Sequence, residues 1–228
     1  TNSENTVIDV TKFYSTDVKS ISGLSAAMRE TYKVKGMDES RSFITAMKSF
    51  PMNIEVVQDF TYNASNPPVM KDAETISIQM NQSMILLPEV PMKPRLADPR
   101  VGWFTMDQID YGSNELKSDS KTFIRRWRLE PKDPEAYARG ELVELIKPKV
   151  YYIDPATPEK LRKYIKQGIE EWQKPFETAG FKNAIIAKDP PTKEEDPDFS
   201  PEDIRYSVIR YVASTTRNAF GPSVSHPR

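Results

Sequence analysis

The chain has 228 residues, with 32 basic and 33 acidic side chains, one histidine, no cysteine and a hydrophobic fraction of 38%. The lack of a basic excess argues against nucleic acid as a partner, because Lys and Arg supply most of the affinity for phosphate. No apolar run approaches the roughly 18–20 residues that a membrane-spanning helix needs, so no transmembrane segment is expected. A catalytic zinc site usually takes three His, Cys or carboxylate ligands, and His226 alone cannot build one. We therefore assign no catalytic residue and no metal ligand to this chain.

The first half of the chain is predicted to be rich in strands. Residues 6–10 (TVIDV) alternate as a short strand, and 38–50 fit a helical turn or two that Pro51 closes. Residues 54–62 and 75–87 are rich in β-branched and aromatic side chains, and the segment between them is rich in Asn, Ser and Pro. This pattern predicts a long antiparallel hairpin.

A proline-rich connector follows, and then a further strand. Four prolines within residues 88–103 exclude regular structure there. Residues 122–129 (TFIRRWRL) have the composition of a strand, and a polar linker comes after them. Up to about residue 146 the pattern indicates a β-rich, antiparallel N-terminal domain.

The last eighty residues predict a strand, a helix and two strands. The strands are expected at 149–153, 181–188 and 204–214, and the helix at 157–179. For the helix, Thr157 is the expected N-cap, Gly180 the C-terminal cap and Pro175 the site of a kink or early end. This order implies a helix packed on a sheet, and the chain as a whole is predicted to be α+β, with domains 1–146 and 147–228.

Several segments of the chain resemble one family of large bacterial zinc-dependent metalloproteases with a metzincin-type catalytic domain. Those similar to the protease domain are 151–154, the helix containing Trp172, 179–184, 201–206 and 220–224. Those similar to the uncharacterised N-terminal domain of the same family are 92–102 and 123–129.

The resemblance implies that this chain is the N-terminal domain plus the first half of a protease domain. The active-site helix, with the motif H-E-x-x-H-x-x-G-x-x-H, should follow residues 220–224, and this chain contains no H-E-x-x-H. No catalytic or metal-binding residue can therefore be carried over, the substrate-binding residues are unknown, and His226 stands where an acidic residue is expected. Truncation there would leave the strand at 204–214 as an edge.

The function expected from the resemblance belongs to the parent protein, an exported endopeptidase of the periplasm or cell surface that uses zinc-activated water. The chain itself would be non-catalytic and need no cofactor, while zinc is expected in the parent. Its partners would be the remainder of the protease domain and, in the parent, a peptide or protein substrate. The alternative is a complete, non-enzymatic cell-surface module that binds protein or glycan through a sheet edge or the Arg/Trp strand.

Three groups of residues could have either a functional or a structural role. Trp127, among arginines, fits a nucleic-acid or glycan platform, but strand alternation favours a core strand whose arginines form the rim. The acidic loop at 194–198 could hold calcium, yet it lacks the glycine and spacing of an EF-hand, and a solvated loop is favoured. Asp107 and Asp110 could be an acid–base pair, although nothing supports this beyond their proximity in sequence, and a turn is favoured.

Two further groups are expected to be structural. Tyr164, Trp172 and Phe176 form an aromatic stripe that should pack on the sheet. The connector residues Arg95, Asp98 and Arg100 could line a cleft, but a local ion-pair network is at least as well supported.

Overall fold

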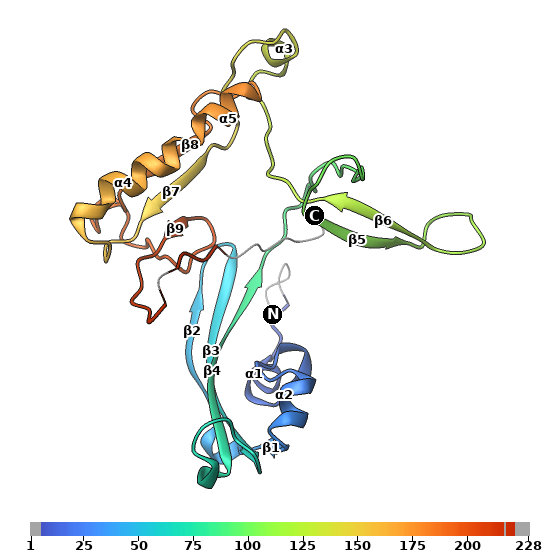
Figure 1. The fold of residues 1–228 in the computed structure, drawn as a ribbon, viewed down its shortest axis with the longest axis vertical. Coiled ribbons are helices and arrows are strands. Elements are labelled where there is room, and N and C mark those ends of the chain that lie inside the picture. Colours follow the sequence, from blue (N-terminus) through green and yellow to red (C-terminus); the bar gives the residue numbers. More distant parts are fainter. Residues whose placement is uncertain (1–5, 217, 222–228) are drawn as a thin grey trace. The chain divides into compact units, whose positions relative to one another are not determined.

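A computed structural model describes residues 6–216 and 218–221 of the chain (Figure 1). The fold is α+β with strand predominating, as the sequence predicts. Contacts divide the chain into two compact units, and each is described by itself below. One unit comprises the residues up to Leu86 together with Glu202–Arg205, and the other comprises Leu87–Pro201 and the residues from Tyr206. In the described ranges no helix is both long and apolar enough to cross a membrane.

The first unit is an antiparallel sheet with short helices on one face. Its elements are α1 (Thr11–Ser15), η1 (Lys19–Ile21), α2 (Ala26–Thr31), β1 (Val34–Met37), η2 (Glu39–Arg41), β2 (Phe43–Ser49), β3 (Asn53–Ala64), η3 (Lys71–Ala73) and β4 (Thr75–Ile85). The long strand β3 pairs with β4 along its length and with β2 and β1 on its other side. The β3–β4 pair confirms the predicted hairpin, and its unbroken register runs from Asn53 opposite Ile85 to Asn63 opposite Thr75.

The core of this unit lies between the sheet and the helical segments. Leu24, Phe60, Tyr62 and Met80 form a buried apolar cluster. Arg29 closes its edge, because its guanidinium donates to both carboxylate oxygens of Asp17 at 2.7 and 2.5 Å and lies 5.1 Å from the centre of the Tyr62 ring. This bidentate ion pair joins the helical segments into one layer.

Two predictions for this unit are wrong. Residues 6–10 form no strand, because no strand of the described residues pairs with them and alternation alone cannot supply a pairing partner. Residues 38–50 are helical only at η2, where Asp38 accepts a hydrogen bond from the Ser40 backbone N–H. The rest is strand β2, because pairing with β3 outweighs the local preference for a helical turn.

A short distant segment, Glu202–Arg205, completes the first unit. The buried side chain of Asn53 donates to the Glu202 carbonyl oxygen at 2.9 Å and to the Glu55 carboxylate at 2.6 Å, and it accepts from the Ile204 backbone N–H at 3.1 Å. Lys48 also forms an ion pair with the Glu202 side chain. One amide thus satisfies both a carbonyl and an N–H of the distant segment.

The second unit contains a hairpin and a separate parallel sheet with its helices. The elements are β5 (Thr105–Asp110), β6 (Asp119–Ile124), α3 (Pro134–Ala138), β7 (Lys149–Ile153), α4 (Glu159–Glu170), α5 (Gln173–Thr178), β8 (Ile185–Lys188) and β9 (Ser207–Ile209). Strands β5 and β6 pair only with each other among the described strands. Before them, residues 88–103 form no helix or strand, as the prolines predict.

The expected strand, helix, strand, strand order is present as β7, α4, β8 and β9. The three strands are parallel, in the order β8-β7-β9. On one face, Ile169 of α4 packs against Ile153 and Ile185 of the sheet in a buried cluster. On the other face the ring of Tyr152 packs against Phe199 and Tyr206, with ring centres 5.5 and 5.6 Å away.

The predicted helix is broken in two for a reason that the sequence contains. Helix α4 ends at Glu170 and α5 begins at Gln173. Pro175 has no N–H to donate to the carbonyl of Glu171, and its ring crowds that carbonyl, so the break falls where proline disfavours helix. Gly180 ends α5 with φ +92°, and the Phe181 N–H donates to the Phe176 carbonyl at 2.8 Å. The expected C-terminal cap is confirmed.

Other details of this unit differ from prediction. Pro158, not Thr157, is the N-cap residue of α4, and the Thr157 hydroxyl is buried without a hydrogen-bond partner in the described part of the chain. Strand β9 is shorter than 204–214 because Glu202–Arg205 are engaged in the first unit. Strand β8 begins only at Ile185, since Phe181 belongs to a separate cluster with Val143.

The aromatic stripe on the helix is only partly core. Phe176 packs against the sheet cluster, but Tyr164 is 67% exposed and Trp172 is 61% exposed. A three-stranded sheet is too narrow to cover the whole apolar flank of α4 and α5, so Tyr164 and Trp172 remain largely exposed.

Candidate functional site

The two aspartates considered as an acid–base pair lie on strand β5. Three positions apart on one strand, their side chains point to opposite faces. Asp107 accepts a hydrogen bond from the Thr122 hydroxyl at 2.6 Å, and Asp110 pairs with Lys121 at 2.5 Å and accepts from the Gly112 N–H. Both carboxylates stabilise the β5–β6 hairpin, and the expected turn begins only after Asp110.

The acidic loop at 194–198 is held by local hydrogen bonds. Glu195 accepts from the Thr192 N–H at 2.8 Å, and Asp196 accepts from the Tyr206 hydroxyl at 2.5 Å. Within the described part of the chain, no three His, Cys, Asp or Glu side chains come together as a metal site. The residues present therefore do not fit a zinc ion. His226 and residues 222–224 lie outside the described residues.

The connector residues separate into an ion pair and a groove residue. The Arg100 guanidinium holds the pKa of Asp98 below its ordinary value through hydrogen bonds at 2.6–3.1 Å. This pair is the local network that the sequence suggests. Arg95 takes no part in it and instead lines a large groove.

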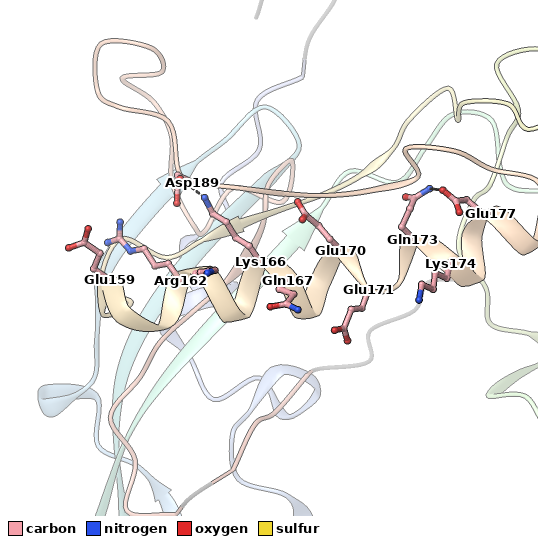
Figure 2. Close-up of a pocket in the computed structure, with 11 residues that line it drawn as sticks. Glu159, Arg162, Lys166, Gln167, Glu170, Glu171, Gln173, Lys174, Glu177 and Asp189 are labelled. Carbon is pink, nitrogen blue, oxygen red and sulfur yellow. Dashed lines mark hydrogen bonds and ion pairs between the residues drawn. The ribbon is translucent and has the colours of Figure 1, made fainter.

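Of two hollows in the second unit, one is a charged helix surface. It runs along α4 and α5 and is lined by long polar side chains (Figure 2). Among the side chains drawn, Lys166 reaches Asp189 at 2.5 Å and Gln173 reaches Glu177 at 3.4 Å. Glu171 extends to the opposite side of the helix from them (Figure 2). Interleaved charges on an exposed helix describe a solvated face.

The second hollow, here called the aromatic groove, has a volume of about 1210 Å³ and is mainly apolar. All three tryptophans of the chain line it: Trp103 and Trp127 are 53% and 44% exposed, and Trp172 is 61% exposed. The other lining residues used below are Arg95, Phe104, Arg125, Arg126, Tyr151, Gly168, Phe176, Ile185 and Ile209.

The groove is built around Trp127, which does not lie in a strand. Its ring centre is 5.9 Å from that of Phe176 and 6.3 Å from that of Tyr151. Lys149 places its ammonium 5.4 Å from the Trp127 ring centre and donates to the Arg128 carbonyl. Burial lowers the pKa of Lys149. The prediction that 125–129 continue a core strand is wrong, because β6 ends at Ile124 and the following residues form the groove wall.

The groove is positively charged. Its lining contains three arginines and no acidic residue. In the described residues, neither Arg95 nor Arg125 has a carboxylate partner, while Arg126 donates to the Lys93 carbonyl at 2.6 Å. Burial, followed by the nearby charge of Arg95, lowers the pKa of Arg126. Glu130 opposes this effect, but it does not line the groove, so the guanidinium groups of the lining favour a ligand that carries carboxylates.

The protein is α+β with a β-rich N-terminal portion, and its second unit contains an apolar groove lined by three arginines. Residues 1–132 match the family model described as "Domain of unknown function (DUF5117)". Because the match covers more than half of the chain, the chain belongs to this family. No curated protein and no solved structure matches the chain significantly.

Sequence reasoning identified Arg95 and Trp127 as candidates but not the groove that they share. The stripe on α4, the arginines after β6 and the aromatic pair Trp103–Phe104 are far apart in sequence, and only the fold joins them. Gly168, a glycine in the middle of the predicted helix, is a local signal that marks this flank of α4.

Proposed function

We propose that this chain is the non-catalytic, N-terminal part of a zinc-dependent endopeptidase. In the parent, the resemblance implies peptide-bond hydrolysis by zinc-activated water, with every zinc ligand outside this chain. The observation that supports the proposal is the unit β7–α4–β8–β9, which has the strand, helix, strand, strand order expected for the segments that resemble the protease domain. The family membership adds a domain of unknown function ahead of it.

In this proposal the second unit is a scaffold. The parallel sheet and α4 supply one packed layer, and the remainder of the protease domain supplies the active-site helix. Strand β9 pairs on one side with β7 and with no other strand in the described residues. Its second edge is therefore suited to pairing with a further strand of the parent. We propose export to the periplasm or cell surface from the same resemblance.

The test begins with the reading frame that encodes this chain. Finding H-E-x-x-H-x-x-G-x-x-H within a few tens of codons after Arg228 supports the proposal, and a stop codon directly after Arg228 contradicts it. The full-length product should cleave denatured casein and lose that activity to a chelator and to replacement of the motif Glu by Gln. A full-length product that binds no zinc and cleaves nothing would also contradict it.

The aromatic groove favours a second candidate, a non-enzymatic module that binds another protein. Trp, Tyr and Arg are the residues enriched where protein interfaces gain most of their affinity. Under this reading the isolated chain should retain a protein partner with the groove as contact surface. A groove already covered by the chain's own continuation would exclude it.

A further inference from the structure

The parallel sheet of the second unit is covered unevenly on its helix face. Tyr151 and Ile153 on β7, Ile185 on β8 and Ile209 on β9 share that face, because parallel neighbours in register point the same way. Helix α4 packs mainly against β8 and β7. Tyr151, Ile185 and Ile209 also line the aromatic groove, so the groove is the uncovered part of this face. Parallel sheets in folded proteins are covered by helices on their faces.

Helix α4 presents a glycine to this groove. Gly168 lines it, and a β-carbon placed there would meet no atom within 4 Å. A glycine inside a helix lowers stability by about 1 kcal/mol relative to alanine, so its presence on this flank has a cost. In exchange, the absence of a side chain lets a second helix approach α4 closely, as helices packed 8–10 Å apart require.

The other residues that line the aromatic groove indicate which kind of ligand would fit it. The tryptophans offer a broad apolar surface, and Arg95 and Arg125 offer beside it two guanidinium groups that have no carboxylate partner among the described residues. Arg95, Trp103 and Arg125 lie within residues 1–132, whereas Gly168 and Trp172 follow them. The groove is therefore built jointly by the family domain and the segment after it.

We propose that the aromatic groove seats an amphipathic helix from the remainder of the protease domain, with large apolar side chains on the tryptophans and carboxylates against Arg95 and Arg125. The inference rests on the proposed function for the source of the helix. It adds that the domain of unknown function forms one wall of the protease core, and so is required for the protease domain to be complete.

The test is residue-specific hydroxyl-radical footprinting, read by mass spectrometry, of the isolated chain and of the full-length protein. In the isolated chain Trp103, Trp127 and Trp172 should all be oxidised readily. In the full-length protein their oxidation should fall several-fold, while exposed Tyr164, outside the groove, keeps its rate.

Variants of the full-length protein separate docking from general damage. Gly168→Leu places a large side chain where the second helix would approach α4, so it should restore oxidation of Trp172. Gln167→Leu, on the charged face of α4, should not. Arg95→Glu with Arg125→Glu should raise oxidation several-fold, whereas Arg100→Glu, in the same connector but outside the groove, should leave it unchanged. Circular dichroism of the same substitutions in the isolated chain checks that each still folds.

Each other outcome overturns the inference. Equal oxidation of the tryptophans in both proteins means that the groove stays open. Protection that appears in the isolated chain and rises with its concentration means that a second copy is the occupant. Zinc-dependent cleavage with unprotected tryptophans refutes the docking alone, whereas protection without zinc binding refutes the proposed protease and leaves the groove covered by another kind of segment.

Discussion

Replacing Asn53 by Ala should lower the free energy of unfolding of the chain by about 3 kcal/mol. The side chain makes two hydrogen bonds to the backbone of Glu202 and Ile204 and one to the Glu55 carboxylate. Neutral hydrogen bonds contribute about 1 kcal/mol each, and one to a charged group contributes about 1.5–3 kcal/mol. Because the three bonds share one side chain, their sum is reduced by non-additivity.

The measurement is urea unfolding, with hydrogen exchange of residues 202–205 as a local readout. Asn63→Ala, on the same strand but exposed, is the matched control and should change stability by less than about 0.5 kcal/mol. Asn53→Asp keeps the acceptor for the Ile204 N–H but puts a second carboxylate beside Glu55, so its loss of stability should shrink as the pH falls to about 4. If Asn53→Ala unfolds at the same urea concentration as Asn63→Ala, the amide does not hold the distant segment.

Three further predictions concern single positions. Gly168→Ala should stabilise the isolated chain by about 0.8–1 kcal/mol in urea unfolding, since it improves helix propensity in open space; a loss of stability would refute the open flank. Gly180→Ala should lower the thermal midpoint and cost about 2 kcal/mol or more, because φ is +92° and the new β-carbon would lie 2.6 Å from the Tyr137 ring; an unchanged midpoint would contradict the cap. Hydrogen bonds from Arg29 hold the pKa of Asp17 below its ordinary value, so this pair stabilises the fold fully above the unfolded pKa of about 3.9 and less as the pH falls through the lower folded value. Asp17→Asn should cost about 2 kcal/mol at pH 7, and this difference from the unsubstituted chain should shrink in acid; a difference independent of pH would refute the ion pair.

The sequence predicted elements well where local signals and tertiary contacts agree. The strands β3 and β4 are rich in β-branched and aromatic residues on either side of a turn-rich segment, Gly180 has the positive φ that only glycine adopts easily, and Pro175 marks the helix break. In each case the residue type restricts the backbone by itself, whatever packs around it.

Predictions failed where a distant partner decides the outcome. Residues 43–49 become strand because β3 lies beside them, and β9 is short because the residues before it bind Asn53. The exposure of Trp172 depends on how many strands the sheet has, and this cannot be predicted from the residues near Trp172 alone. The groove could not be predicted for the same reason, since its walls are joined only by the fold.

The first unit is discontinuous, and this has a consequence for the order of folding. Its main part ends at Leu86, but Glu202–Arg205 can join only after all of residues 87–201 have been synthesised. Closing so long a loop carries an entropic cost, although this grows slowly with length. During synthesis the β3–β4 sheet would therefore form before Glu202 and Ile204 are available to hydrogen-bond Asn53. Such a partly folded intermediate is of the kind that chaperones recognise. The first unit can therefore be complete only in a chain that has been synthesised at least as far as residue 205.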